Sequence, residues 1–510
     1  MTDTGQPAPA PVVEQTEIDG IPVFWTPVDG PRMASVMFRV GRADEPAHQA
    51  GITHLVEHLA LAPLAQQDYS HNGFVAAVRT VFHATGTDAQ LTDFVKAICS
   101  ALTSLPLDRV LMERRILTQE AASRGQASIA MLRWYRYGNL AHGLLATEEL
   151  GLDWLGPEPI RAWATSWFTR GNVAVWWSGP PPSDLRLDLP AGARSPVPKP
   201  TVVPGITFPT RADLGGTGAS MSYVAPRSAA TRITLDILER RIRHELRFQR
   251  GLIYDVATDY DPQGAKDAHI GISMDCRRED AVAVTTSLLA ILDDLIKVGP
   301  SEEEVRREAA TFADEATHVG GRLGFLDATT HDALVGRVRE TPAQVVGEYL
   351  GLGPDDIKVA ARVALNSLLV FAPPGPYDGD LIPYPMRSLM AVAGRTIRPS
   401  GWVVGPKARK DRLVVGPDGV SIVWPNDFTI TVRYKDCVAL RHWDGPIREL
   451  WGADGFRIVV RADEWRGGTK VVDEIDKAVP AERVACGEHG IGGLEMPPDG
   501  AEVTQTPAQG

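Results

Sequence analysis

The stretch GITHLVEHLAL, residues 51–61, determines how this chain is interpreted. His54 and His58 are four residues apart, so on a helix their imidazoles lie on the same face. Neutral imidazoles are good zinc ligands, and a catalytic zinc ion takes three protein ligands and a water molecule. Glu57 could then accept a proton from that water. The segment predicts a helix with two metal ligands and a general base; the alternative is an ordinary helix whose histidine nitrogens are satisfied elsewhere.

A second helix is expected after Asp108, which occupies a position typical of an N-cap. Four residues of this helix recur at spacings of three, four and three: Val110, Glu113, Leu117 and Glu120. The two glutamates therefore share a face with apolar side chains, where carboxylates are costly unless they are paired or bind a metal. We interpret Glu120 as the third zinc ligand and Glu113 as a catalytic-site residue that braces the ligands from behind. A salt bridge to an arginine is the alternative.

Length, composition and cysteine usage limit the possible classes of protein. The 510 residues predict about three domains of ordinary globular composition, with 44% hydrophobic and 23% charged residues. A net charge of −12 without a basic face argues against nucleic-acid binding. The chain lacks a signal-peptide pattern and an apolar run of about 18 residues, so we expect a cytoplasmic protein without membrane contact. The cysteines form no CxxC pair and predict reduced thiols: Cys99, Cys276, Cys437 and Cys486.

The order of strand, helix and turn patterns divides the chain into domains. Proline-rich segments at 178–204 and after residue 373 are typical of linkers. In the first domain, apolar patterns predict strands at 21–28, 34–40, 78–85 and 172–177 and a helix at 91–105. The predicted parts are a disordered tail (1–14), a first domain (15–190), a second domain (205–373), a linker (374–410), a small β-rich domain with one terminal helix (411–490), and a tail (491–510).

The two helices together resemble the pitrilysin/insulinase family of metallopeptidases, whose H-x-x-E-H arrangement is the inverzincin motif. Residues 51–61 match the family pattern G-x-x-H-h-x-E-H-h, where h is apolar. Residues 113–120 are similar to its E-R-x-x-h-x-x-E segment, whose second glutamate binds zinc. The likeness extends over about residues 17–373. In one departure, 61 residues separate His58 from Glu120, fewer than is usual in the family.

The resemblance also implies substrate-binding residues. Asn72 begins a segment similar to the family's N-A-F/Y-T turn, which precedes the edge strand that pairs with substrate, although the family's alanine is Gly73 here. Residues 246–254 (LRFQRGLIY) resemble a segment of the second domain whose arginine and tyrosine bind substrate. Arg247, Tyr254 and Asn72 are therefore our candidate substrate-binding residues.

The resemblance implies two homologous α/β sandwich domains that form half of a peptidase chamber. Beyond it, short strands followed by one helix make residues 411–490 similar to a pleckstrin-homology-like barrel. The predicted fold class is therefore α+β, with a small mainly-β C-terminal domain. The implied activity is that of a zinc-dependent endopeptidase acting on peptides or unstructured segments. His54, His58 and Glu120 would hold one Zn²⁺, and Glu57 would take a proton from the zinc-bound water. The peptide would add to an edge strand near residues 78–85. Because two domains cover half of a closed chamber, we expect a homodimer, or a heteromer with a related subunit.

Two hypotheses from other classes stay open. The chain could be a non-catalytic scaffold or a partner subunit of a heteromeric peptidase, although an intact set of metal-binding residues argues against this. It could also be an adaptor recruited through its C-terminal domain, which follows a small basic cluster at residues 407–412. Zinc content and peptidase activity would separate the first hypothesis from the enzyme, and vesicle binding would test the second.

Overall fold

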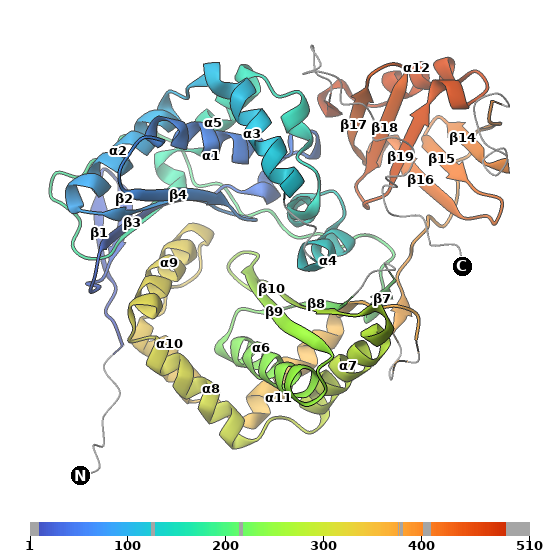
Figure 1. Cartoon of the computed structure of the whole chain (residues 1–510). Helices are drawn as coiled ribbons and strands as arrows, with labels where there is room; N and C mark the ends of the chain where they lie inside the picture. Colours follow the sequence, from blue (N-terminus) through green and yellow to red (C-terminus); the bar gives the residue numbers. More distant parts are fainter. Residues whose placement is uncertain are drawn as a thin grey trace, which may run out of the picture.

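The computed structural model describes residues 10–123, 128–213, 218–375, 377, 381–400 and 410–485. Two α/β units lie against each other, and a smaller β-rich unit lies beside the first (Figure 1). The predicted α+β fold class is confirmed. Most of the predicted N-terminal tail, all of the predicted C-terminal tail and residues 407–409 of the basic cluster lie outside the described residues. No helix in the described part of the chain is both long and apolar enough to span a membrane.

The first unit is a mixed sheet with helices on one face. Its strands lie in the order β1-β2-β6-β3-β5-β4, with β2 parallel to β6 and the other pairs antiparallel. The strands are β1 (Glu14–Ile18), β2 (Ile21–Trp25), β3 (Arg32–Phe38), β4 (Ser70–Val75), β5 (Thr80–Gly86) and β6 (Val173–Trp177). The helices over the sheet are α1 (Ile52–Leu61), α2 (Asp88–Thr103), α3 (Val110–Ser123) and α5 (Pro157–Trp167).

Each predicted strand and helix of this unit is present, with shifted ends. Helix α2 begins at Asp88, before the predicted start, because Thr87 and Gln90 form a capping box that the apolar period does not reveal. Strand β6 is buried along its whole length. A strand covered on both faces has an apolar run in place of alternation, as its sequence shows.

The second unit repeats this topology. Its strands lie in the order β12-β7-β11-β8-β10-β9, and the parallel pair β7 and β11 corresponds to β2 and β6. The strands are β7 (Thr210–Ala212), β8 (Ala219–Pro226), β9 (Ile253–Pro262), β10 (Asp267–Cys276), β11 (Leu369–Phe371) and β12 (Ile382–Pro383). The helices are α6 (Ala229–Ile242), the π-helix η8 (Arg243–Gln249), α7 (Ala281–Lys297), α8 (Glu302–Glu315), α10 (Pro342–Leu350) and α11 (Pro354–Val363).

The two units exchange one helix each. Helix α9 (Val319–Val335) of the second unit packs on the open face of the first sheet, where Leu326 and Leu334 meet Trp176. Helix α4 (Ser128–Tyr137) of the first unit packs on the second sheet in the same way, against β8, β10 and β11. Figure 1 shows both helices between the two sheets. Each sheet is therefore covered on both faces, once by its own helices and once by its neighbour's.

The C-terminal unit consists of two antiparallel sheets and one helix around a single core. One sheet contains β13 (Arg395–Ile397), β14 (Arg412–Gly416), β15 (Gly419–Val423) and β16 (Thr429–Arg433). The other contains β17 (Cys437–Trp443), β18 (Ile447–Gly452), β19 (Arg457–Arg461) and the parallel β20 (Val484–Ala485), and α12 (Gly468–Ala478) packs beside them. This is the expected mainly-β unit with one helix.

Three details differ from the sequence prediction. The edge strand of the first sheet is β4, whereas β5, which covers most of residues 78–85, lies between β3 and β4. Asn72 is therefore within the edge strand and not in a turn before it. Residues 178–204 contain no regular element but are packed, because Leu185, Leu187 and Leu189 are buried in the first core. Strands β12 and β13 lie inside the predicted linker 374–410, since pieces of two or three residues leave no periodic pattern.

Candidate metal centre

Helix α1 is fixed at its N-terminus by a buried carboxylate. Gly51, in the left-handed region at φ +96, is the N-cap residue. The amides of Gly51 and Thr53 donate to the two oxygens of Glu45, at 2.8 and 2.9 Å. A negative charge is favoured at this end of a helix. The helix packs against β4, α2, α3 and α5, so that His54 and Glu57 are both buried.

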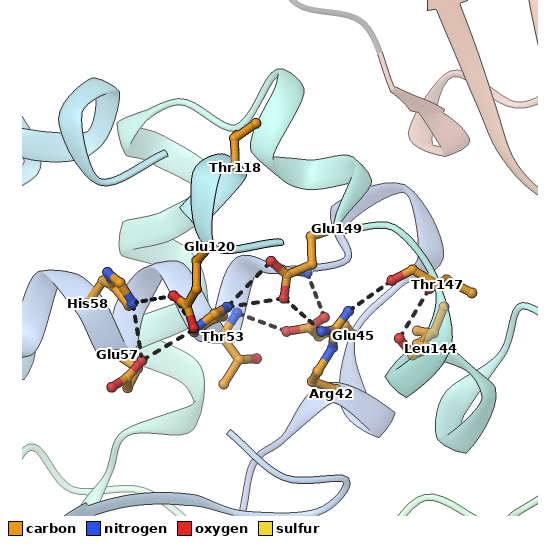
Figure 2. A network of polar contacts seen from close by, with 12 residues as sticks. Arg42, Glu45, Thr53, Glu57, His58, Thr118, Glu120, Leu144, Thr147 and Glu149 are labelled. Atoms are coloured by element: carbon orange, nitrogen blue, oxygen red, sulfur yellow. Dashed lines mark hydrogen bonds and ion pairs between the residues drawn. The ribbon is translucent and has the colours of Figure 1, made fainter. Parts of the chain in front are cut away.

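The ring nitrogens of both histidines face two carboxylates. His58 Nε2 lies 3.6 Å from Glu120 Oε2 and 3.9 Å from Glu57 Oε2. His54 Nε2 lies 4.0 and 3.8 Å from the same two oxygens. Figure 2 shows His58 linked to both glutamates. The structure thus brings together the four residues that the sequence predicted as metal ligands and general base.

The other ring nitrogen of each histidine also meets a carboxylate. His58 Nδ1 lies 3.4 Å from Glu113 Oε2, and Glu113 in turn accepts from Arg109 at 2.8 Å. His54 Nδ1 lies 3.1 Å from Glu149 Oε1. A carboxylate at Nδ1 fixes the ring and leaves Nε2 available for a metal. The buried Glu113 therefore lies behind a ligand as predicted, and the alternative salt bridge to an arginine is present as well.

Glu149 was not found by sequence reasoning. It lies 95 residues from His54, and it also binds Arg42 Nη1 at 2.7 Å (Figure 2). Glu149 can come this close to helix α1 because residue 51 is glycine. A Cβ atom added at Gly51 would lie only 2.7 Å from Glu149 Cβ, which is too close. In the sequence, Glu149 is distinguished only by the apolar Leu150 that follows it. That signal is too weak to predict a contact with His54 when the fold is unknown.

The electrostatic environment differs between the two histidines. Burial lowers the pKa of His58, and the neighbouring His54 lowers it further, against the effect of Glu113. Burial acts in the same direction on His54, but the hydrogen bond and charge of Glu149, with two further carboxylates, raise the pKa of His54. The carboxylates around His54 therefore favour a positive charge there. A bound divalent cation would supply such a charge.

The donor atoms fit a zinc ion in kind and in spacing. A tetrahedral zinc ion with bonds of about 2.0–2.1 Å holds its ligand atoms about 3.3–3.4 Å apart. The Glu120 oxygen lies 3.6 and 4.0 Å from the two Nε2 atoms. Side-chain nitrogen and oxygen atoms of His54, Glu57 and His58 lie within 4.8 Å of one another. Among the described residues, this is the one group of His, Cys, Asp or Glu side chains that is close enough to hold a metal ion. The Glu120 oxygen is thus about 0.2–0.7 Å farther from each imidazole nitrogen than such an ion requires, and Glu57, the predicted general base, lies within the same group.

The three candidate substrate-binding residues lie on exposed edges. Asn72 is exposed on β4, next to the metal centre, since β4 contacts α1. Arg247 of η8 lies over the ring of Tyr254, with its guanidinium carbon 5.4 Å from the ring centroid. Tyr254 is the second residue of the edge strand β9 and is 82% exposed. Arg247 also contacts Phe248 and Asp255. The structure therefore pairs Arg247 with Tyr254 but brings neither into contact with the histidine cluster in the described residues.

Gly73 determines how closely the edge strand approaches the general base. An added Cβ at Gly73 would lie 2.4 Å from Glu57 Oε1 and 3.1 Å from Glu57 Cδ. Gly73→Ala should therefore displace the Glu57 carboxylate while leaving the ligands in place. We expect turnover of a peptide substrate to fall by about 10- to 100-fold, with zinc affinity changed by less than about twofold.

The matched control for this prediction is Gly86→Ala on the neighbouring strand β5. Its added Cβ meets the side chain of Gln90 and not Glu57. Turnover and zinc affinity would be measured for both variants. Equal turnover in Gly73→Ala and Gly86→Ala would contradict the assigned contact between β4 and Glu57.

Comparisons with known proteins agree with this architecture. Residues 198–312 match the family model described as the Peptidase M16 inactive domain, which covers part of the second unit and none of the histidine cluster. No curated protein matches the chain. Similar solved structures include a protease from Helicobacter pylori, with 17% identity and a TM-score of 0.60 over 71% of this chain and 100% of that one.

Two further structures have the same fold. The M16 inactive-domain protein from Pseudomonas fluorescens is 14% identical, with a TM-score of 0.58 over 72% of this chain and 100% of that one. The first half of the periplasmic protease PqqL from Escherichia coli is 12% identical, with a TM-score of 0.55 over 72% and 93%. The first two units thus have the fold of M16 proteases, the group to which the pitrilysin/insulinase resemblance points.

Proposed function

We propose that this chain is a zinc-dependent endopeptidase that hydrolyses peptides or unstructured segments. The observation that carries the proposal is the convergence of His54, His58, Glu57 and Glu120, with a carboxylate behind each imidazole. Three of the four carboxylates in this set, those of Glu57, Glu113 and Glu149, have buried side chains. Burying so many carboxylates in one small region is costly unless they are paired or bind a metal. The M16 protease fold around it supports a peptidase-related role.

His54, His58 and Glu120 would hold the zinc ion. Bound zinc supplies a water molecule of lowered pKa and polarises the carbonyl of the scissile bond. Glu57, buried beside the two histidines, holds the proton taken from that water and passes it to the leaving amine. Glu113 and Glu149 keep the imidazoles in the orientation that presents Nε2 to the ion.

The substrate would be an extended peptide. Within the described part of the chain, β4 is the last strand of its sheet and pairs with β5 alone, so its other side can accept an added strand next to α1. Main-chain pairing of this kind gives loose sequence preference. Arg247 and Tyr254 would anchor the same peptide from the second unit, either within one chain or across a homodimer. The described cysteines, Cys99, Cys276 and Cys437, are unpaired, in keeping with a cytoplasmic location as part of this proposal.

Metal analysis and chelation test this proposal. The purified full-length chain should contain about one zinc ion and should cleave an internally quenched, unstructured peptide. Removal of zinc by a chelator should abolish cleavage, and stoichiometric zinc should restore it. A protein that binds no zinc, or one whose cleavage survives chelation, would contradict the proposal.

A non-catalytic partner subunit is the second candidate function. The observation that favours it is the match of residues 198–312 to a domain described as inactive. A subunit of this kind would bind an unstructured peptide without cleaving it and would gain activity only when mixed with a related subunit. Peptide binding measured by fluorescence anisotropy, together with the absence of cleavage by the zinc-loaded chain, would identify it.

A further inference from the structure

The C-terminal unit is attached to a short segment of the first unit, residues 148–153. Arg441 of β17 places Nη1 2.9 Å from Glu148 Oε2 and Nη2 2.6 Å from Asp153 Oδ2. Arg457 of β19 binds the other oxygen of Glu148 at 2.8 Å. The side chain of Arg441 is only 9% exposed, whereas those of its partners Glu148 and Asp153 are 51% and 32% exposed. Arg441 therefore holds both ends of the segment.

The same segment supports the metal centre. Glu149, next to Glu148, lies 3.1 Å from His54 Nδ1. The backbone amide of Gly151 donates to the Ala50 carbonyl at 2.8 Å. Ala50 directly precedes Gly51, the N-cap residue of α1. The segment 148–153 therefore links the C-terminal unit to the ring of His54 and to the beginning of the helix that carries it.

Apolar packing and backbone hydrogen bonds complete this contact. Leu150 packs with Ala439 and Trp451 of the C-terminal unit, and all three are buried. Asn139 of the first unit donates from Nδ2 to the Gly452 carbonyl at 2.9 Å. Its backbone amide donates to the Ala453 carbonyl at 3.1 Å. The contact between the two units therefore combines ion pairs, hydrogen bonds and a buried apolar patch.

We propose that the C-terminal unit is part of the apparatus that shapes the metal centre, and that Arg441 is a positioning residue acting through segment 148–153 on Glu149 and His54. The inference rests on the proposed zinc function. A metal-binding histidine depends on the group that fixes its second nitrogen. Release of the segment would leave the ion pair with Arg42 to hold the Glu149 carboxylate without support from the C-terminal unit. The His54 ring would then be held less firmly in the orientation that presents Nε2 to the ion.

Zinc affinity of Arg441→Met in the full-length chain tests the proposal. Competition with a chromophoric chelator should show zinc bound about 3- to 10-fold more weakly, below the range of about 10- to 100-fold typical of residues that contact a ligand directly. The visible absorption of the cobalt-substituted variant should also shift, because ligand geometry changes. Arg441→Lys keeps the charge but not the two-pronged contact, and should give an intermediate affinity.

Arg448→Met is the matched control. Arg448 makes an equally close pair with Asp476 inside the C-terminal unit, at 2.7 and 2.8 Å, and does not touch segment 148–153. Its zinc affinity and cobalt spectrum should match those of the wild type. Arg441→Met with unchanged affinity, or equal losses in Arg441→Met and Arg448→Met, would overturn the inference while the proposed function stands.

Two further outcomes are distinguishable. A wild type that binds no zinc overturns the proposed function and this inference together. If Arg441→Met fails to fold, Glu148→Gln gives the same test. The side chain of Glu148 is half exposed and glutamine has nearly the same shape, so this substitution should not prevent folding. Weaker zinc binding by Glu148→Gln supports the inference, and unchanged binding overturns it.

Discussion

Glu57→Gln should retain zinc and lose peptidase activity by about 100- to 10,000-fold, the usual contribution of a positioned general base. Glutamine has nearly the same shape as glutamate, so the packing of this buried side chain against Gly73 and the two histidines should persist. The amide cannot accept the proton from water at neutral pH. The measurements are kcat/KM on a quenched fluorescent peptide and zinc content of the purified protein.

The control for this prediction is Glu158→Gln on the exposed surface of α5, where the side chain is 81% exposed. It removes one carboxylate charge without touching the metal centre and should behave as the wild type. Normal turnover by Glu57→Gln would remove Glu57 from the mechanism. Loss of zinc in Glu57→Gln would instead indicate that Glu57 is a ligand and that Glu120 is not.

Glu120→Ala is expected to weaken zinc binding beyond the roughly 100-fold upper range for residues that only support a ligand. The reason is that Glu120 Oε2 is the carboxylate oxygen at 3.6 and 4.0 Å from the two Nε2 atoms, so its removal leaves two protein ligands. Glu113→Gln should cost about 10- to 100-fold, because it leaves all three ligands but weakens the hold on the His58 ring. Zinc dissociation constants from chelator competition would rank the two variants.

Gln119→Ala provides the comparison within the same helix. Gln119 is exposed on α3, next to Glu120 in sequence, and its truncation tests whether any change on this turn disturbs the site. It should leave zinc affinity unchanged. If Glu120→Ala binds zinc as tightly as Gln119→Ala does, Glu120 is not the third ligand, and the assignment based on its helix face and on the E-R-x-x-h-x-x-E likeness is wrong.

Local periodicity predicted which side chains share a face of each helix, and the family resemblance then predicted that the two faces meet. The spacing of His54 and His58 and the repeat that places Glu113 and Glu120 beside apolar residues are properties of single helices, and these helices form. Val110, Glu113 and Leu117 are buried, as that repeat predicts, whereas the side chain of Glu120 at its end is 37% exposed. Each of these helices has an apolar face, and both faces are buried when α1 packs against α3.

Features that depend on distant parts of the chain could not be predicted in this way. Glu149 approaches His54 across 95 residues of sequence, through a segment held by the C-terminal unit. The identity of the edge strand depends on which strand stays unpaired in a six-stranded sheet, and both β4 and β5 have strand-like sequences. The proline-rich stretch at 178–204 was interpreted from its prolines, whereas its three buried leucines attach it to the first core.

The second unit has no histidine cluster of its own among the described residues. The packing of α9 on the first sheet and of α4 on the second nevertheless makes each unit depend on the other. In the second unit, the strand and helix that correspond to β3 and α1 are β8 and α6, and α6 contains no histidine. Yet Leu326 and Leu334 of that unit shield Trp176 and the open face of the first sheet from water. Polar substitutions at Leu326 or Leu334 would expose Trp176 and the open face of the first sheet to water, whereas substitutions in α6 would leave this contact in place. The second unit is therefore needed for the apolar cover that it gives the first sheet, whatever chemistry it carries.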